Sequence, residues 1–92
     1  MMFAKRLRER VISGEITASV RIWQKPHVKV GGRYPLGGGH IEVTAIREIS
    51  LSDVTAALAR ETGFDGLVDL LKVAKHGPGE RVFLVEFEFH DG

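Results

Sequence analysis

The sequence predicts an α+β domain, mainly β, in which a small antiparallel barrel is flanked by helices. Apolar and polar residues alternate in several short segments, which is typical of strands. The predicted order is one helix, three strands, two helices and one strand, which argues against a doubly wound parallel sheet. Several short strands in a chain of 92 residues favour a closed or nearly closed barrel, because closure removes exposed edges. This length has room for one core, so residues 1–92 are predicted to form a single domain.

A helix is predicted over residues 3–13. Phe3, Leu7 and Val11 are four residues apart and form one apolar stripe. Gly14 follows, where a left-handed residue commonly ends a helix. The basic residues fall mostly off the stripe and are expected to face solvent or a ligand: Lys5, Arg6, Arg8 and Arg10.

Three strands are predicted next. Residues 16–23 alternate, with Ala18, Val20 and Ile22 on one face. The other face would be half-exposed and carry Thr17, Ser19, Arg21 and Trp23. A second strand is expected over 28–36 with a bend at Gly31-Gly32, then a glycine turn over 37–39 and a third strand over 40–49. The alternation changes phase after Ala45, as at a β-bulge.

The second half of the chain predicts two helices and a last strand. A helix over 53–62 would be capped by Ser50 or Ser52 and end at Gly63. Asp65 would cap a second helix, which ends at Gly77 before a Pro78-Gly79 turn. Residues 82–89 would form the last strand, with Phe83, Val85, Phe87 and Phe89 on one side.

Composition narrows the class of protein. Hydrophobic residues make up 43% and charged residues 27%, which is ordinary for a soluble globular chain. The absence of cysteine excludes disulfide-linked partners and cysteine metal sites. No apolar run could span a membrane, and the basic N-terminus does not lead into a secretory signal. The chain is therefore predicted to be cytoplasmic, with no membrane partner.

Charge is divided unevenly along the sequence. Residues 1–41 hold eight Lys and Arg against two Glu, whereas residues 42–92 hold five against ten Asp and Glu. The basic half also contains the single Trp, the single Tyr and the glycine-rich stretch 31–39. Cations, aromatic rings and permissive backbone suit a phosphate-bearing or nucleotide ligand. The alternative is that halves of the sequence are not halves of the surface and the charges are simply solvated.

Several kinds of site are disfavoured. The four histidines, His27, His40, His76 and His90, are scattered without metal-ligand spacing, so we predict no metal and no cofactor. No G-x-S-x-G surrounds a serine. The glycines near Gly37 lack the Lys-Ser/Thr of a phosphate-binding loop and lead into a strand.

The first predicted strand and the turn after it carry the candidate binding site. Arg21 can donate two parallel hydrogen bonds to a phosphate or a base edge, and Trp23 can stack on a base. Lys25, Lys29 and Arg33 can follow a phosphate backbone. The alternative is structural: Trp23 is a core or rim residue packed on the N-terminal helix, and Arg21 pairs with Glu42 or Glu48 across the sheet.

An ordered set of short segments resembles the ASCH domain family: 14–21 (GEITASVR), 29–31 (KVG), 59–64 (ARETGF) and 82–89 (VFLVEFEF). The resemblance implies a PUA-like fold, a small β-barrel with flanking helices and a cleft between them. It also implies association with RNA or modified bases.

One bacterial branch of that family hydrolyses N4-acetylcytidine with a lysine, a threonine and a glutamate. Carried over by position, the lysine falls on Ile16, the threonine on Ser19 and the glutamate near Glu61. Ile16 cannot serve as nucleophile, base or oxyanion partner, so this catalytic set is incomplete. Lys25 or Lys29 could enter from the following loop as a substitute.

The sequence leaves three functional hypotheses. The first is an RNA- or nucleotide-binding domain whose cleft is lined by Thr17, Ser19, Arg21, Trp23 and Lys25, with Lys5, Arg8, Lys29 and Arg33 extending the positive surface. The second is an amidohydrolase of N4-acylated cytidine that uses Ser19, Glu61 and Lys25. The third is an interaction module whose basic face meets an acidic protein.

Overall fold

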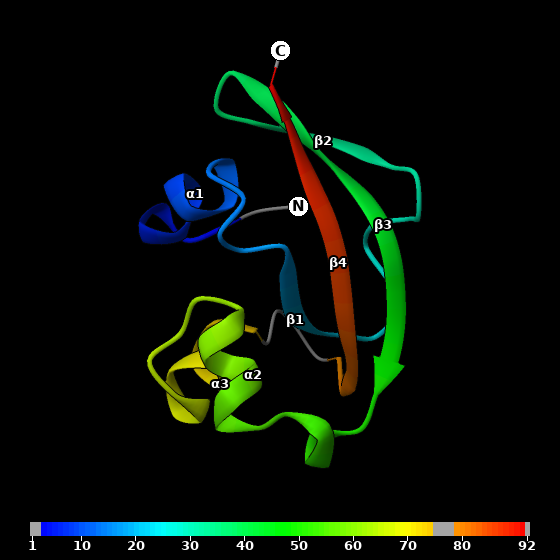
Figure 1. Cartoon of the computed structure of the whole chain (residues 1–92). Coiled ribbons are helices and arrows are strands. Elements are labelled where there is room, and N and C mark those ends of the chain that lie inside the picture. Colours follow the sequence, from blue (N-terminus) through cyan, green and yellow to red (C-terminus); the bar gives the residue numbers. More distant parts are fainter. Residues whose placement is uncertain (1–2, 75–78, 92) are drawn as a thin grey trace.

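The chain folds into a curled, four-stranded antiparallel half-barrel with helices beside it (Figure 1). The computed structural model describes residues 3–74 and 79–91. The predicted class, α+β and mainly β, is confirmed, and helices and strands follow the predicted order with one added 3-10 turn. The elements are α1 (Lys5–Ile12), β1 (Ala18–Trp23), β2 (Arg33–Leu36), β3 (Gly39–Ile49), the 3-10 turn η1 (Leu51–Asp53), α2 (Ala56–Glu61), α3 (Leu67–Ala74) and β4 (Arg81–Asp91).

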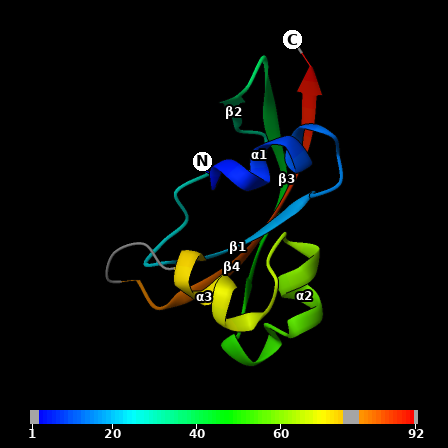
Figure 2. The same cartoon turned by 90° about the vertical axis from the view of Figure 1, so that its left-hand side faces the viewer.

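The sheet has the order β1-β4-β3-β2, so β4 lies inside it and pairs with both β1 and β3. The predicted closed or nearly closed barrel is found in part: within the described residues it is a half-barrel, with β1 and β2 as the two edges of the sheet. The β1 edge is flanked by helices, α1 toward one end and α2 and α3 toward the other (Figure 2).

The predicted bulge in β3 is confirmed. Val43 pairs with Phe87, but the next paired residue is Ala45, opposite Glu86, so Thr44 is the extra residue. One extra residue reverses the alternation, which brings Ile46 to the sheet face of Val43.

The second predicted strand is shorter than expected. Its first half is a turn with Gly31 at φ +82°, and the Gly31 N–H donates to the Val43 carbonyl at 2.7 Å. Only Arg33–Leu36 runs as a regular strand, because the positive φ at Gly31 interrupts the extended backbone.

The predicted helix over 53–62 is divided. Ser50 and Asp53 form a capping box on the 3-10 turn η1, and α2 begins later, where the Thr55 hydroxyl accepts from the Leu58 N–H. Val54 between the two is extended and buried, so it joins the core instead of a helix. Gly63, at φ +99°, lies just beyond the C-cap of α2 and ends this segment as predicted. The predicted end of the next helix at Gly77, and Pro78 of the turn, lie outside the described residues.

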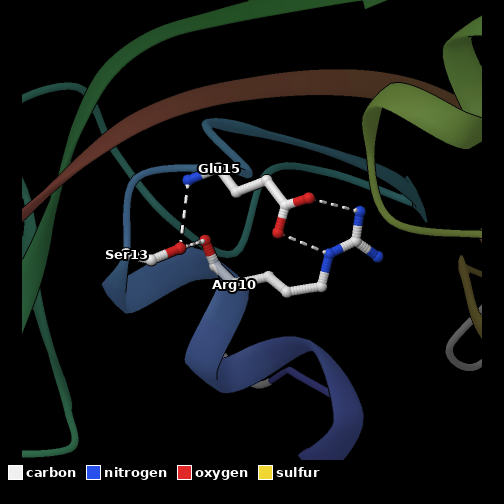
Figure 3. A network of polar contacts seen from close by, with 3 residues as sticks. All are labelled: Arg10, Ser13 and Glu15. Atoms are coloured by element: carbon white, nitrogen blue, oxygen red, sulfur yellow. Dashed lines mark hydrogen bonds and ion pairs between the residues drawn. The ribbon is translucent and has the colours of Figure 1, made fainter.

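A small polar network fixes the end of α1 (Figure 3). The Ser13 hydroxyl donates to the Arg10 carbonyl and accepts from the Glu15 N–H, while Arg10 Nε donates to the Glu15 carboxylate at 2.9 Å. Gly14 takes φ +83°, as its position predicts. The chain therefore turns sharply from α1 toward β1.

β1 is buried on both faces, which corrects the half-exposed strand expected from its alternation. On one face Arg21 lies beside Phe3, just before α1. On the other, Ile22 borders a small hollow with Leu71 of α3. Alternation of polar and apolar residues cannot reveal a cover supplied by distant helices. Within the described residues, no helix is long and apolar enough to cross a membrane.

Candidate functional site

A hollow of about 250 Å³ opens between α1, β1 and α3. Figure 2 shows these elements together, with β1 passing between α1 and α3. The hollow is lined by Phe3, Ala4, Leu7, Ser19, Val20, Arg21, Phe64, Val73 and Ala74. Its wall is therefore mostly apolar, and Arg21 is the single charged side chain among these residues.

Arg21 is 8% exposed, which is unusual for an arginine. Its Nε donates to the Ser19 hydroxyl at 2.9 Å, and its guanidinium carbon lies 5.3 Å from the centroid of the Phe3 ring. Desolvation by burial lowers the pKa of Arg21 to about 10. The guanidinium therefore stays charged at neutral pH, held by Ser19 on a mostly apolar wall.

Strand pairing explains why Ser19 and Arg21 share this wall. The two residues are two apart in β1 and therefore point to one face, opposite Val85 and Phe83 of β4. Phe3 packs edge-on against Phe87, which is also in β4, with the two ring centroids 5.4 Å apart. The aromatic rings thus hold the segment before α1 against the sheet and close one side of the hollow.

An ion pair connects the two helices that flank the hollow. Arg6 Nη2 of α1 donates to Asp69 Oδ2 of α3 at 2.9 Å, and the Arg6 guanidinium lies 5.6 Å from the centroid of the Phe64 ring. The hydrogen bond from Arg6, aided by one from the Asp65 N–H, holds the pKa of Asp69 below its usual value. Asp69 is therefore ionised at neutral pH, and we call this pair the α1–α3 clasp.

The structure brings Ser19 and Arg21 together in the hollow and separates them from the other predicted binding residues. Thr17, Lys25, Lys29 and Arg33 are exposed and do not line it. The Lys29 backbone instead supports the turn, where its N–H donates to the Tyr34 hydroxyl. Lys5 and Arg8 are exposed on α1 and do not line the hollow.

Trp23 belongs to the core, which corrects its expected exposure for stacking on a base. It is 3% exposed, and its ring stacks on His27 with centroids 4.8 Å apart and approaches Phe83 at 6.0 Å. The alternative prediction of a core position for Trp23 is therefore confirmed, with its ring against His27 and Phe83 and not, as predicted, shown packing on the N-terminal helix.

Cross-strand pairing of arginine with Glu42 and Glu48 occurs through Arg33 and Arg81. Arg33 pairs with Glu42 at 3.4 Å. Arg81 donates two hydrogen bonds to Glu48, which raises the pKa of Arg81 and lowers that of Glu48. These pairs lie at the surface, whereas Arg21 is buried in the wall of the hollow.

The residues considered for amidohydrolase chemistry do not form a cluster. Ser19 lines the hollow, whereas Glu61 at the end of α2 and Lys25 are exposed and lie outside its lining. Ile16 is 2% exposed, deep in the core. No group of three His, Asp or Glu within 3–74 and 79–91 is placed to hold a metal ion.

Sequence reasoning missed the contributions of Phe64, Val73 and the clasp. Phe64 follows the helix-ending Gly63, so its position after α2 was visible, but the hollow it borders was not. Val73 and Asp69 lie on α3, far from α1 in the sequence, and the two residues of the clasp are 63 positions apart. A local sequence pattern cannot predict a contact between residues so far apart in the chain.

In comparisons with known proteins, no protein-family model, curated protein or solved structure matches the chain.

Proposed function

We propose that this chain binds a nucleotide-sized ligand, either a free nucleotide or an unpaired nucleotide of RNA, with the base in the hollow between α1, β1 and α3. The observation that carries the proposal is the buried, charged Arg21 on the wall of an otherwise apolar hollow. Burying a cation costs free energy that an apolar residue would not cost, so a ligand-binding role is a reason to have it there.

The shape and chemistry of the hollow suit a single base. Its volume of about 250 Å³ is slightly below the range of pockets that take drug-sized ligands. The walls include Phe3 and Phe64, and aromatic side chains are common contacts of unstacked bases. Among the lining side chains, the polar group beside Arg21 is the Ser19 hydroxyl, which can donate or accept.

Arginine favours particular bases, because a guanidinium donates hydrogen bonds and accepts none. Guanine offers two adjacent acceptors, O6 and N7, whereas adenine places an amino donor beside N7. We therefore propose that guanine binds better than adenine. The resemblance to the ASCH family, with its implied PUA-like cleft and RNA association, agrees with this proposal without carrying it.

Isothermal titration of the four nucleoside 5′-monophosphates, and of a short single-stranded RNA, tests the proposal. We expect binding of the guanine nucleotide to exceed that of the adenine nucleotide, and Arg21→Met to weaken it by about tenfold or more. The matched control is Arg47→Met, which removes an exposed arginine paired with Glu86 outside the hollow. Absence of binding to every probe, or equal losses in both variants, would contradict the proposal.

A further inference from the structure

We propose that Arg6 is the phosphate-binding group of this site and that Asp69 holds it in the ligand-free protein. The ligand would therefore be a nucleoside 5′-phosphate, or a nucleotide with its phosphodiester, and a bare nucleoside would bind more weakly. This inference rests on the proposed binding of a base in the hollow. It adds that the ligand carries a phosphate, which binds Arg6 outside the hollow.

The clasp adjoins the hollow from both helices. On α1, Arg6 precedes Leu7, which lines the hollow, and its guanidinium lies over Phe64, another lining residue. On α3, Asp69 lies one turn before Val73, which also lines it. The Arg6–Asp69 ion pair therefore connects the two helices next to the hollow, with the Arg6 guanidinium over the ring of the lining residue Phe64.

The phosphate belongs beside the hollow and not within it. The wall is nearly all apolar, and a phosphate surrounded by such a wall would lose its hydration with one buried arginine as compensation. Beside the hollow, Arg6 is half-exposed, with 51% of its side chain accessible. A ligand that leaves its phosphate there keeps most of its hydration and gains a guanidinium.

The phosphate of such a ligand can replace the Asp69 carboxylate as the partner of Arg6. The ion pair is partly exposed, with Asp69 at 33% accessibility, and exposed pairs contribute little to stability. A phosphate offers three acceptor oxygens and up to two negative charges, and it accepts paired hydrogen bonds from arginine. The carboxylate therefore serves as a resident competitor for Arg6, and removing its charge would free the cation for the ligand.

The test compares guanosine with guanosine 5′-monophosphate by isothermal titration at fixed ionic strength. In the native chain the nucleotide should bind more tightly than the nucleoside. Asp69→Asn should strengthen nucleotide binding by about fivefold and leave nucleoside binding unchanged. Arg6→Gln should remove the preference for the nucleotide without weakening the nucleoside, and Arg6→Lys should restore part of it.

Two matched controls separate a local effect from net charge. Glu86→Gln removes one negative charge from the exposed pair with Arg47, and Arg10→Gln removes one positive charge from the exposed pair with Glu15 on the same helix as Arg6. Both should leave the nucleotide-to-nucleoside ratio as it is in the native chain.

The outcomes distinguish the two proposals. Equal nucleotide and nucleoside affinity in the native chain, or an equal effect of Asp69→Asn and Glu86→Gln, would overturn the role of Arg6 and leave base binding intact. Absence of binding to both probes would overturn the proposed function itself. Thermal unfolding of each variant, followed by Trp23 fluorescence, checks that an altered affinity does not come from a lost fold.

Discussion

At the scale of single residues, Arg21 stands out because a charged side chain is buried away from water. Its guanidinium lies against the Phe3 ring with Ser19 as a hydrogen-bond partner, and the residue is 8% exposed. Burial lowers the pKa of Arg21 to about 10, a direction that means the folded state disfavours the charge. A residue kept in such a place at a cost to stability is a candidate for function.

Arg21→Met should weaken ligand binding and leave the free energy of unfolding nearly unchanged. Replacing a buried charge by an apolar side chain of similar length is often neutral or stabilising, so we expect the free energy of unfolding to fall by no more than about 1 kcal/mol, or to rise. Urea denaturation followed by Trp23 fluorescence measures it. Phe87→Ala, a buried core truncation, should by comparison cost about 3–5 kcal/mol. A loss of similar size for Arg21→Met would show that the guanidinium is structural.

At the scale of elements, Gly63 determines how α2 approaches α1. Its φ of +99° is one that residues with a side chain rarely adopt. A Cβ added there would lie 2.6 Å from Ile16 Cδ1 and 2.7 Å from Leu7 Cδ2. The turn after α2 therefore packs tightly on the segment that includes α1 and leads into β1, which helps to position Phe64 at the hollow.

Gly63→Ala should destabilise the protein by about 2 kcal/mol or more, because backbone strain adds to the steric overlap. Gly66→Ala is the matched control, since a Cβ at that position meets nothing within 4 Å and its φ is not positive. Urea denaturation of both variants measures the difference. Equal stabilities would show that the chain relaxes around the added methyl group without cost.

The α1–α3 clasp predicts a pH dependence. The pKa of Asp69 is lowered by its hydrogen bond from Arg6, so its contribution to stability is present above the unfolded-state value of about 3.9. That contribution is lost as pH falls through the lower folded-state value. The difference in urea midpoint between the native chain and Asp69→Asn should therefore be constant at neutral pH and disappear in acid. A difference that persists below about pH 2 would contradict this account.

Local patterns predicted most elements and few of the contacts between them. The apolar stripe before Gly14, the bulge in β3 and the end of α2 at Gly63 depend on neighbours in sequence, and each was predicted correctly. The burial of Trp23 involves Phe83 of β4 as well as the nearby His27, and Arg21 lines a hollow together with residues of α3. Their alternation in β1 is the same whether the polar face meets solvent or a helix, so the sequence pattern could not distinguish the two.

At the scale of the whole molecule, the folded chain partly neutralises the charge division of its sequence. Arg6 pairs with Asp69 and Arg33 with Glu42, which joins the basic half to the acidic half. Arg10 is paired with Glu15 within the basic half. Arg6, Arg10 and Arg33 of the basic half are therefore each held in an ion pair.

Salt dependence of RNA binding tests this arrangement. One phosphate contact, from Arg6, predicts a slope of log affinity against log salt of about −0.7 for a single strand, because Arg21 meets the base and neutralises no phosphate. A surface that used all eight cations of residues 1–41 would give about −6. Filter binding of a short single-stranded RNA over a range of salt concentrations measures the slope. A steep slope would favour a broad electrostatic surface over a defined pocket.

The central position of β4 has a consequence for how this domain forms. β1 and β3 each pair with β4, which follows them both in the chain. While a ribosome is still translating the segments through α3, β1 has no strand to pair with, and its apolar residues have no sheet to join. Pairing over so long a separation is slow and leaves apolar segments exposed to aggregation or chaperones. The hollow, whose wall includes β1, is therefore completed late, after β4 has been synthesised.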